Sequence, residues 1–196
     1  MTLATSLLPD RTDRRVLRTQ TALRDAMLSL IAEKGWDALA VQDICERANV
    51  GRSTFYVHFQ SKEALLNFGL GGLRTGLQEA TTGASASRAD AKLSLIARGL
   101  LEHLHEQRKL ARAIIGRRSG QVVYSRFRAM VVELVAAELT PSSKATWQHE
   151  ANVQMIAGAL MGLLTWRVDV PSPPPIDETV RQFETLIAPA LRQLAA

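Results

Sequence analysis

No proline occurs between Pro9 and Pro141, and this long run restricts the fold more than any other feature of the sequence. A proline inside a helix removes a backbone hydrogen bond and clashes with the preceding turn, so long helices need proline-free sequence. The alternation of apolar and polar residues that is typical of strands is nearly absent, because the valine pairs 122–123 and 131–132 both lie in helical patterns. The sequence therefore predicts an all-α fold.

Apolar residues recur every three or four positions along most of the chain, which predicts about nine helices. Ser61 fits the N-cap of the fourth helix, and Pro189 is expected to kink the last one. The expected helix ranges are 12–34, 41–48, 52–58, a longer helix from Ser61 into the small-residue stretch 81–87, one around 93–104, 108–116, 120–139, 147–166 and 176–195.

The composition argues against several other classes of protein. One cysteine allows no internal disulfide and makes a cysteine-based metal site unexpected. The longest apolar stretch, 151–166, is shorter than a membrane span, and residues 1–9 lack the pattern of a signal peptide. We therefore expect a cytoplasmic protein with no membrane partner. The net charge of +5 permits a nucleic-acid partner but does not require one.

Residues 41–58 have the pattern of two short helices joined by a sharp turn. Helices of this length are not stable alone, so they must pack on each other and on the helix before them. Ile44 and Ala48 form the inner face of the first helix, and Phe55 and Phe59 that of the second, because each pair is four residues apart. Asn49 can adopt the left-handed conformation that the turn needs.

The outer face of the second short helix carries mainly hydrogen-bond donors. Its residues are Arg52, Ser53, Thr54, Tyr56 and His58. A short helix with such a face is suited to the major groove of DNA, where donors and acceptors on base edges are read. The pattern therefore predicts a helix–turn–helix DNA-binding domain.

Six short motifs follow one another in this region: Gly35-Trp36, Ala40-Val41, Ile44-Cys45, Ala48-Asn49-Val50, Tyr56-Val57-His58-Phe59 and Ser61-Lys62-Glu63. In this order they resemble the DNA-binding domain of the tetracycline-repressor-like (TetR) family of bacterial transcriptional regulators. The resemblance covers Leu17 to Phe68, and the rest of the chain is similar to the family only in its helical layout. Ala40, Asn49 and Gly51 replace the family's usual Thr, Gly and Ser, which alters expected contacts but not the fold.

The resemblance implies which residues contact DNA. Tyr56 and His58 are expected on phosphates, against the alternative that both are interior aromatics. Lys62 at a helix N-terminus is a natural phosphate ligand, against the alternative of a solvated helix start. Arg52 is expected to read bases together with Ser53 and Thr54. The complete expected set is Gln42, Arg52, Ser53, Thr54, Tyr56, His58 and Lys62.

Nothing in the sequence indicates catalysis, a metal or a cofactor. Cys45 replaces an inner-face alanine and is expected in the core. His103 and His105 are two residues apart on a helix, so they point in different directions and cannot share a metal ion. No Ser-His-Asp arrangement and no phosphate-binding loop motif is found. We therefore expect that the protein is not an enzyme.

The resemblance implies a homodimeric repressor with a DNA-binding domain at 1–60, ordered from about residue 12, and a helical effector-binding and dimerisation domain at 61–196. Dimerisation is expected through 143–167 and 176–195, because Gly158 and Gly162 allow close helix packing. A dimer matches a palindromic operator. A small-molecule effector would bind among the middle helices and release the DNA. The expected pocket residues are Leu100, Leu104, Ile114, Val123, Phe127, Met130, Trp147, Met155 and Ala159.

Two alternatives and one further question stay open at this point. The protein could instead be an activator or architectural DNA-binding protein without an effector, or a non-DNA interaction module or enzyme that carries a helix–turn–helix. Seven basic residues and no acidic one lie between positions 108 and 128. They fit a solvated face, a surface that attracts DNA phosphates, or the entrance for an anionic effector.

Overall fold

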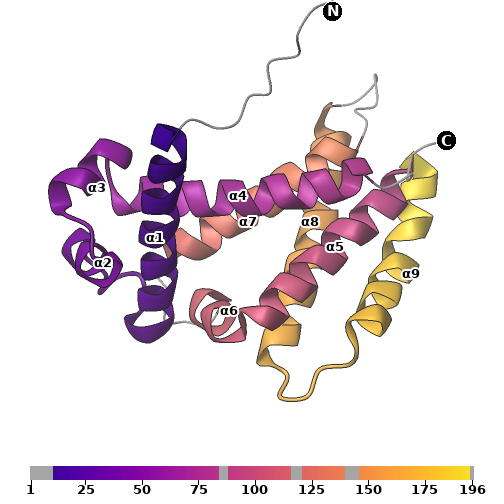
Figure 1. Ribbon diagram of the computed structural model, residues 1–196. Coiled ribbons are helices and arrows are strands. Elements are labelled where there is room, and N and C mark those ends of the chain that lie inside the picture. The colour runs from indigo at the N-terminus through magenta and orange to yellow at the C-terminus, as the bar shows by residue number, and fades with distance from the viewer. Residues whose placement is uncertain (1–10, 84–87, 116–120, 140–145, 195–196) are drawn as a thin grey trace, which may run out of the picture.

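The computed structural model describes residues 11–83, 88–115, 121–139 and 146–194, and every regular element in these ranges is an α-helix (Figure 1). The helices are α1 (Arg11–Lys34), α2 (Val41–Ala48), α3 (Arg52–His58), α4 (Lys62–Gly83), α5 (Ala89–Glu106), α6 (Arg108–Ile115), α7 (Gln121–Glu138), α8 (Thr146–Asp169) and α9 (Ile176–Leu194). The predicted all-α fold is confirmed. The bounds of α2 and α3 agree with the expected ranges, whereas α5 and α8 extend further at both ends. Apart from Val168, the added residues are polar or alanine and so carry no apolar pattern.

The first of two buried apolar clusters holds α1, α2 and α3 together. Met27 of α1, Ile44 of α2 and Phe55 of α3 are fully buried in it. Leu65 from the start of α4 and Val123 from α7 belong to the same cluster. The first turns of α4 therefore pack with the N-terminal helices, so the domain boundary at residue 60 stays a prediction.

The second cluster lies among α4, α5, α7, α8 and α9. Figure 1 shows α9 running alongside α5, and Phe183 of α9 is buried in this cluster with Leu100 and Leu101 of α5. Gly99 marks a close approach of α5 to α4, because a Cβ atom there would lie 2.5 Å from Leu77 Cδ2. The second cluster thus forms the core of the helical body, which α4 connects to the N-terminal helices.

The basic residues between 108 and 128 act largely as links between helices. Arg108 Nη2 donates to the backbone carbonyl of Val170, at 2.8 Å, and Arg112 Nε donates to that of Val168, at 3.4 Å. Both acceptors lie at the C-terminal end of α8, where free carbonyls and the helix dipole favour cations. Arg126 donates to Asn67 of α4 at 3.0 Å, and Arg128 to Gln154 of α8 at 2.7 Å. Residues 117 and 118 lie outside the described ranges.

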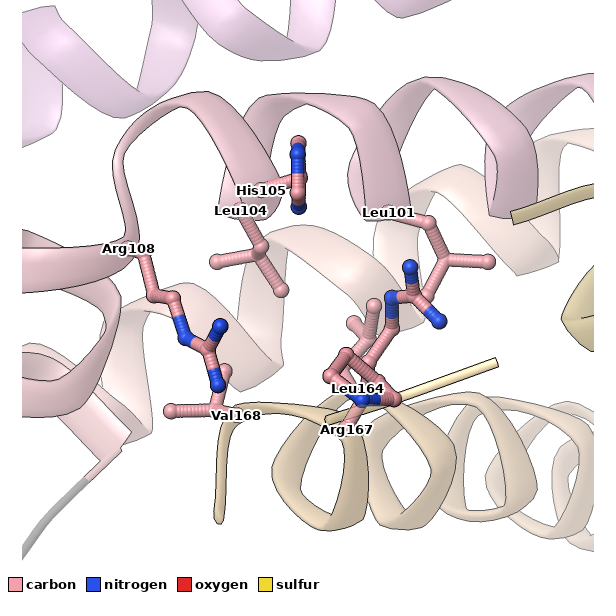
Figure 2. Close-up of a pocket in the computed structure, with 8 residues that line it drawn as sticks. Leu101, Leu104, His105, Arg108, Leu164, Arg167 and Val168 are labelled. Carbon is pink, nitrogen blue, oxygen red and sulfur yellow. The ribbon is translucent and has the colours of Figure 1, made fainter. Parts of the chain in front are cut away.

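A third arginine reinforces the same end of α8. Arg167 is 7% exposed, and its Nη1 donates to the carbonyl of Pro174 at 2.5 Å and to Thr179 Oγ1 at 2.9 Å. Arg108 and Arg167 line a small cavity between α5 and α8 (Figure 2), whose volume is about 10 Å³. A cavity of this size holds about one water molecule, so this end of the bundle is closely packed.

Among the helices described, none has the length and apolar character needed to span a membrane.

Candidate nucleic-acid interface and interdomain cleft

The turn between α2 and α3 has the predicted conformation. Asn49 adopts the left-handed conformation, with φ 52° and ψ 45°, which confirms the prediction for this residue. Its backbone N–H donates to the carbonyl of Glu46 at 3.2 Å, and that of Val50 donates to Cys45 at 2.9 Å. Gly51 is the N-cap of α3 and provides no side-chain hydrogen bond. The two backbone hydrogen bonds therefore fix the end of α2 and, with it, the orientation of α3 relative to α2.

Packing between aromatic rings holds the inner face of α3 against the core. Phe55 is fully buried, and its ring centroid lies 6.0 Å from that of Phe59, which in turn lies 5.4 Å from Phe68 of α4. Cys45 is buried as expected, and burial raises the pKa of its thiol. These contacts leave one face of α3 in the core and the other in solvent.

The outer face of α3 presents a row of exposed side chains. Arg52, Ser53 and Thr54 are exposed, Tyr56 is 50% exposed, and His58 is half-buried against Phe59 at a ring distance of 6.4 Å. Val57 is 80% exposed, which the sequence pattern did not single out. Its place between Tyr56 and His58, on the outer face of α3, was the feature of the sequence that could have indicated this exposure.

Gln42 lies near the start of α3 although it belongs to α2. Its Nε2 donates to Glu46 Oε1 at 2.9 Å, and both residues line a shallow depression of about 420 Å³ that also includes Arg52. The structure thus brings Gln42 and Arg52, two of the expected DNA-contacting residues, to one surface.

Lys62 has a different environment from the one expected. Its Nζ donates to the backbone carbonyls of Trp36, at 3.0 Å, and Leu39, at 2.8 Å, and lies 4.6 Å from the centre of the Trp36 ring. An ammonium group has three donors, so two are used within the protein. Lys62 therefore ties the start of α4 to the turn after α1, and its phosphate contact stays a prediction.

Replacing Lys62 with methionine is expected to lower the free energy of unfolding by about 1–3 kcal/mol, because two hydrogen bonds from a charged group are lost. The carbonyl of Leu39 loses this donor, whereas that of Trp36 keeps the backbone N–H of Leu39. Urea unfolding measures this. Lys109→Met is the matched control, because Lys109 is exposed and forms no hydrogen bond or ion pair among the described residues. Equal stability of the two variants would contradict the structural role of Lys62.

Two carboxylates hold α2 on α1. Arg47 of α2 makes two hydrogen bonds of 2.7 Å to the carboxylate of Glu33 and one of 2.9 Å to Ser29 Oγ. The hydrogen bond from Arg47, with a second from Ser29, lowers the pKa of Glu33 to about 2. Asp43 accepts from Lys34 at 2.7 Å and from the backbone N–H of Ala40 at 2.7 Å, and both lower its pKa. Asp43 thereby caps α2 although Ala40 has no hydroxyl.

A cleft of about 1080 Å³ lies between α1, α4, α5 and α6, and we refer to it as the interdomain cleft. Three of the expected effector-pocket residues, Leu104, Ile114 and Phe127, line it. Others lie elsewhere: Leu100, Val123 and Met130 are buried in the clusters, Ala159 is half-buried on α8, and Trp147 and Met155 are 70% and 64% exposed.

The cleft also contains residues that the sequence did not identify as a group. Arg24, Leu28, Ser29 and Ala32 of α1 form one wall, and His103 of α5 forms part of another. His103 and His105 face separate cavities, since His105 lines the small cavity of Figure 2. Burial lowers the pKa of the His103 imidazole.

A long helix α1 followed by two short helices, of which α3 has an exposed polar face, is the arrangement of a helix–turn–helix DNA-binding domain, here attached to a helical body. Comparisons with known proteins agree. Residues 23–67 match the family described as "Bacterial regulatory proteins, tetR family". The N-terminal segment therefore matches the tetR family of bacterial regulatory proteins, whose members are DNA-binding transcription factors, and the chain as a whole is similar to TetR regulators in fold.

Two relatives from Bacillus subtilis each match a segment of this chain. The HTH-type transcriptional regulator YxbF is 46% identical over 55 residues, which is 28% of this chain and 14% of YxbF. The HTH-type regulator YuxN is 40% identical over 42 residues, 21% of this chain and 14% of YuxN. The matched segment thus spans well under two thirds of either relative.

Solved structures share the whole fold. A TetR transcriptional regulator from Streptococcus agalactiae has a TM-score of 0.64 and 23% identity, over 90% of this chain and 97% of that one. FadR from Bacillus subtilis, solved with stearoyl-CoA, has a TM-score of 0.65 and 19% identity, over 85% and 96%. A TetR-family regulator from Streptomyces coelicolor has a TM-score of 0.67 and 20% identity, over 95% and 99%.

Proposed function

We propose that this chain acts as a homodimeric transcriptional repressor that leaves a palindromic operator when a small molecule binds. The observation that carries the proposal is the exposed outer face of α3, with Arg52, Ser53, Thr54 and Tyr56 on a helix fixed by Phe55. A helix that packs one face in the core and exposes a polar opposite face meets the requirements of a recognition helix in the major groove.

The residues of this face differ in their proposed roles. Arg52 donates to base edges, with Ser53 and Thr54 beside it, because guanidinium and hydroxyl groups match the donors and acceptors of the major groove. Tyr56, His58 and the remaining donor of Lys62 bind phosphates, which positions the helix without reading sequence. Gln42 assists from the start of α2. Val57 is suited to contact a thymine methyl group.

The partner in the proposed dimer is a second copy of the chain. Trp147, Ala151, Met155, Gly158, Gly162 and Trp166 recur every three or four residues along the exposed face of α8, and we call them the α8 stripe. A Cβ atom at Gly158 or Gly162 would meet no atom within 4 Å. Leu186 of α9 adds an apolar side chain that is 64% exposed. Exposed apolar surface of this kind supports an interface, and small residues allow close helix packing.

The interdomain cleft supports the effector part of the proposal. It contacts both α1, which carries the DNA-binding helices, and α5 and α6 of the body. A ligand that fits the cleft better when α1 has moved would shift the population away from the DNA-bound spacing. FadR, a neighbour of the same fold, was solved with stearoyl-CoA, which supports the presence of a small-molecule site in this chain.

Two alanine variants test the DNA-binding face. Arg52→Ala is expected to weaken operator binding by about 1–3 kcal/mol and to relax the base preference, whereas Tyr56→Ala should weaken binding to all sequences alike. Fluorescence anisotropy with the operator and with single-base variants measures both effects. If both proteins bind like the parent, α3 is not the recognition helix.

Activation without an effector stays an alternative, since a neighbour of the same fold is the dihydroxyacetone kinase operon activator DhaS, with a TM-score of 0.59 and 17% identity. A reporter gene under the operator separates the two functions, because deletion of a repressor raises expression and deletion of an activator lowers it. A chain that shifts no DNA from its own upstream region would instead favour an interaction module.

A further inference from the structure

The interdomain cleft owes its volume to missing side chains on α4. Gly69, Gly72 and Gly76 line it and are spaced three and four residues apart, so they share one helix face. A Cβ atom at Gly72 or Gly76 would meet no atom within 4 Å, so larger side chains at these positions would occupy the cleft. Gly71 also has open space around it, but it lines a different cavity, between α4 and α7.

The walls of the cleft are mainly aliphatic. Leucines from α1, α4, α5 and α6 form most of their apolar surface, together with Ile114 and Phe127. Only Phe127 is aromatic, so the lining offers little for stacking an aromatic ligand. Flexible leucine side chains are suited to an aliphatic chain, which gains by removing apolar surface from water.

Most charges around the cleft already have partners. Arg24 pairs with Asp25 at 2.8 Å, Glu102 approaches Arg98 at 3.8 Å, and Arg108 donates to the carbonyl of Val170. Two further charges, Glu106 and Lys109, are exposed and of opposite sign. The charged groups therefore give an ionic ligand no clear advantage over a neutral one.

The side chain of His103 differs from most charged groups around the cleft, because it has no partner within the described residues. It is half-buried in the wall of the cleft, and its imidazole forms no hydrogen bond within the described part of the chain. Burial lowers its pKa, which favours the neutral imidazole with one donor and one acceptor nitrogen. The other neutral polar side chains of the wall are Ser29, which already bonds Glu33 and Arg47, and Gln107, which is exposed. A half-buried, neutral imidazole in an aliphatic cleft is a recognisable pattern for a ligand site.

We propose that the interdomain cleft binds an uncharged small molecule with a flexible aliphatic body and one hydrogen-bonding head group, which pairs with His103. This inference rests on the proposed regulation by an effector and names its site and chemical class. The cleft also connects to the DNA-binding helices, because Ser29 lines it and accepts a hydrogen bond from Arg47 of α2 at 2.9 Å. A bound molecule that displaces α1 therefore acts on α2 through this contact.

The chemical class is tested by isothermal titration of the full chain with 1-decanol, decanoate and decyltrimethylammonium, each below its aggregation concentration. These probes share one alkyl chain and differ in the charge of the head. 1-Decanol is expected to bind at least tenfold tighter than either ion. Equal or tighter binding of an ion would overturn the class, and no binding of any probe would overturn the site.

The location is tested by two neighbouring substitutions on the same helix. Gly72→Leu is expected to weaken 1-decanol binding at least tenfold, whereas Gly71→Leu, which also has open space but faces another cavity, should leave it unchanged. Circular dichroism checks that both fold, and Gly76→Leu replaces Gly72→Leu if that variant does not. Equal losses, or no loss, in the two variants would overturn the location.

Operator binding separates this inference from the proposed function. Release of operator DNA by 1-decanol from the parent and from Gly71→Leu, but not from Gly72→Leu, supports both. Binding of 1-decanol in the cleft without release leaves the site standing and overturns the release mechanism. Operator binding by a chain that takes up none of the probes leaves the DNA-binding function standing and overturns the cleft.

Discussion

A Gly158→Arg variant is expected to fold but to remain monomeric, and to bind operator DNA weaker than the parent by a factor on the order of 10² to 10⁴. Gly158 is exposed in the middle of the α8 stripe, where a Cβ atom meets nothing within 4 Å, so arginine fits the single chain. In a dimer, arginine would hold the helices apart and bury a charge without a partner. A monomer presents one recognition helix and loses the benefit of two linked half-sites.

Sedimentation velocity and fluorescence anisotropy measure the two effects. Glu150→Arg is the matched control, because Glu150 is exposed on the same helix but lies outside the α8 stripe. This control should remain dimeric and bind DNA like the parent. A Gly158→Arg protein that is still dimeric would contradict the proposed interface, and a monomer with full affinity would contradict the role of the dimer.

Replacing Phe55 with alanine is expected to lower the free energy of unfolding by about 3–5 kcal/mol. Phe55 is fully buried, packs against Phe59, and lies in the cluster that joins α1, α2 and α3. Short helices such as α2 and α3 depend on such tertiary packing, since they are not stable alone. The cavity left by the missing ring therefore affects the whole DNA-binding domain.

Urea unfolding followed by circular dichroism measures the loss. Val57→Ala is the control on the same helix, because Val57 is 80% exposed, and its change should stay within about 0.5 kcal/mol. A loss below about 1 kcal/mol for Phe55→Ala would show that α3 is not anchored by this ring, since buried phenylalanines cost more than that when truncated.

The parts of the molecule that the sequence predicted are those that depend on nearby residues. The bounds of α2 and α3, the left-handed Asn49 and the buried pair Phe55 and Phe59 all follow from spacings of four residues and from turn chemistry. Ser61 also accepts a hydrogen bond from the backbone N–H of Ala64, at 3.3 Å, as an N-cap does.

The parts that the sequence did not predict depend on contacts between distant segments. Lys62 binds carbonyls 26 and 23 residues earlier in the chain, and Arg108 and Arg112 reach the end of α8. No local pattern specifies such partners. The wall that α1 gives the interdomain cleft was missed for the same reason, although the spacing of Gly69, Gly72 and Gly76 was visible.

Helix α8 shows the limit of the apolar pattern itself. Apolar residues lie on nearly all sides of this helix, yet Trp147 and Met155 are exposed in the single chain. Apolar content indicates that a face is to be covered, but it does not say whether the cover comes from the same chain or from a partner.

Footprinting of the DNA upstream of this gene with the purified chain tests the central claim most directly. We expect two protected half-sites related by two-fold symmetry, with centres about 34–36 Å apart or a multiple of that distance, since each α3 would occupy one major groove. Loss of the protection in a triple variant with Arg52→Ala, Ser53→Ala and Thr54→Ala would show that α3 makes the sequence-specific contacts. Absence of sequence-specific protection, or a footprint unchanged in that triple variant, would contradict the account.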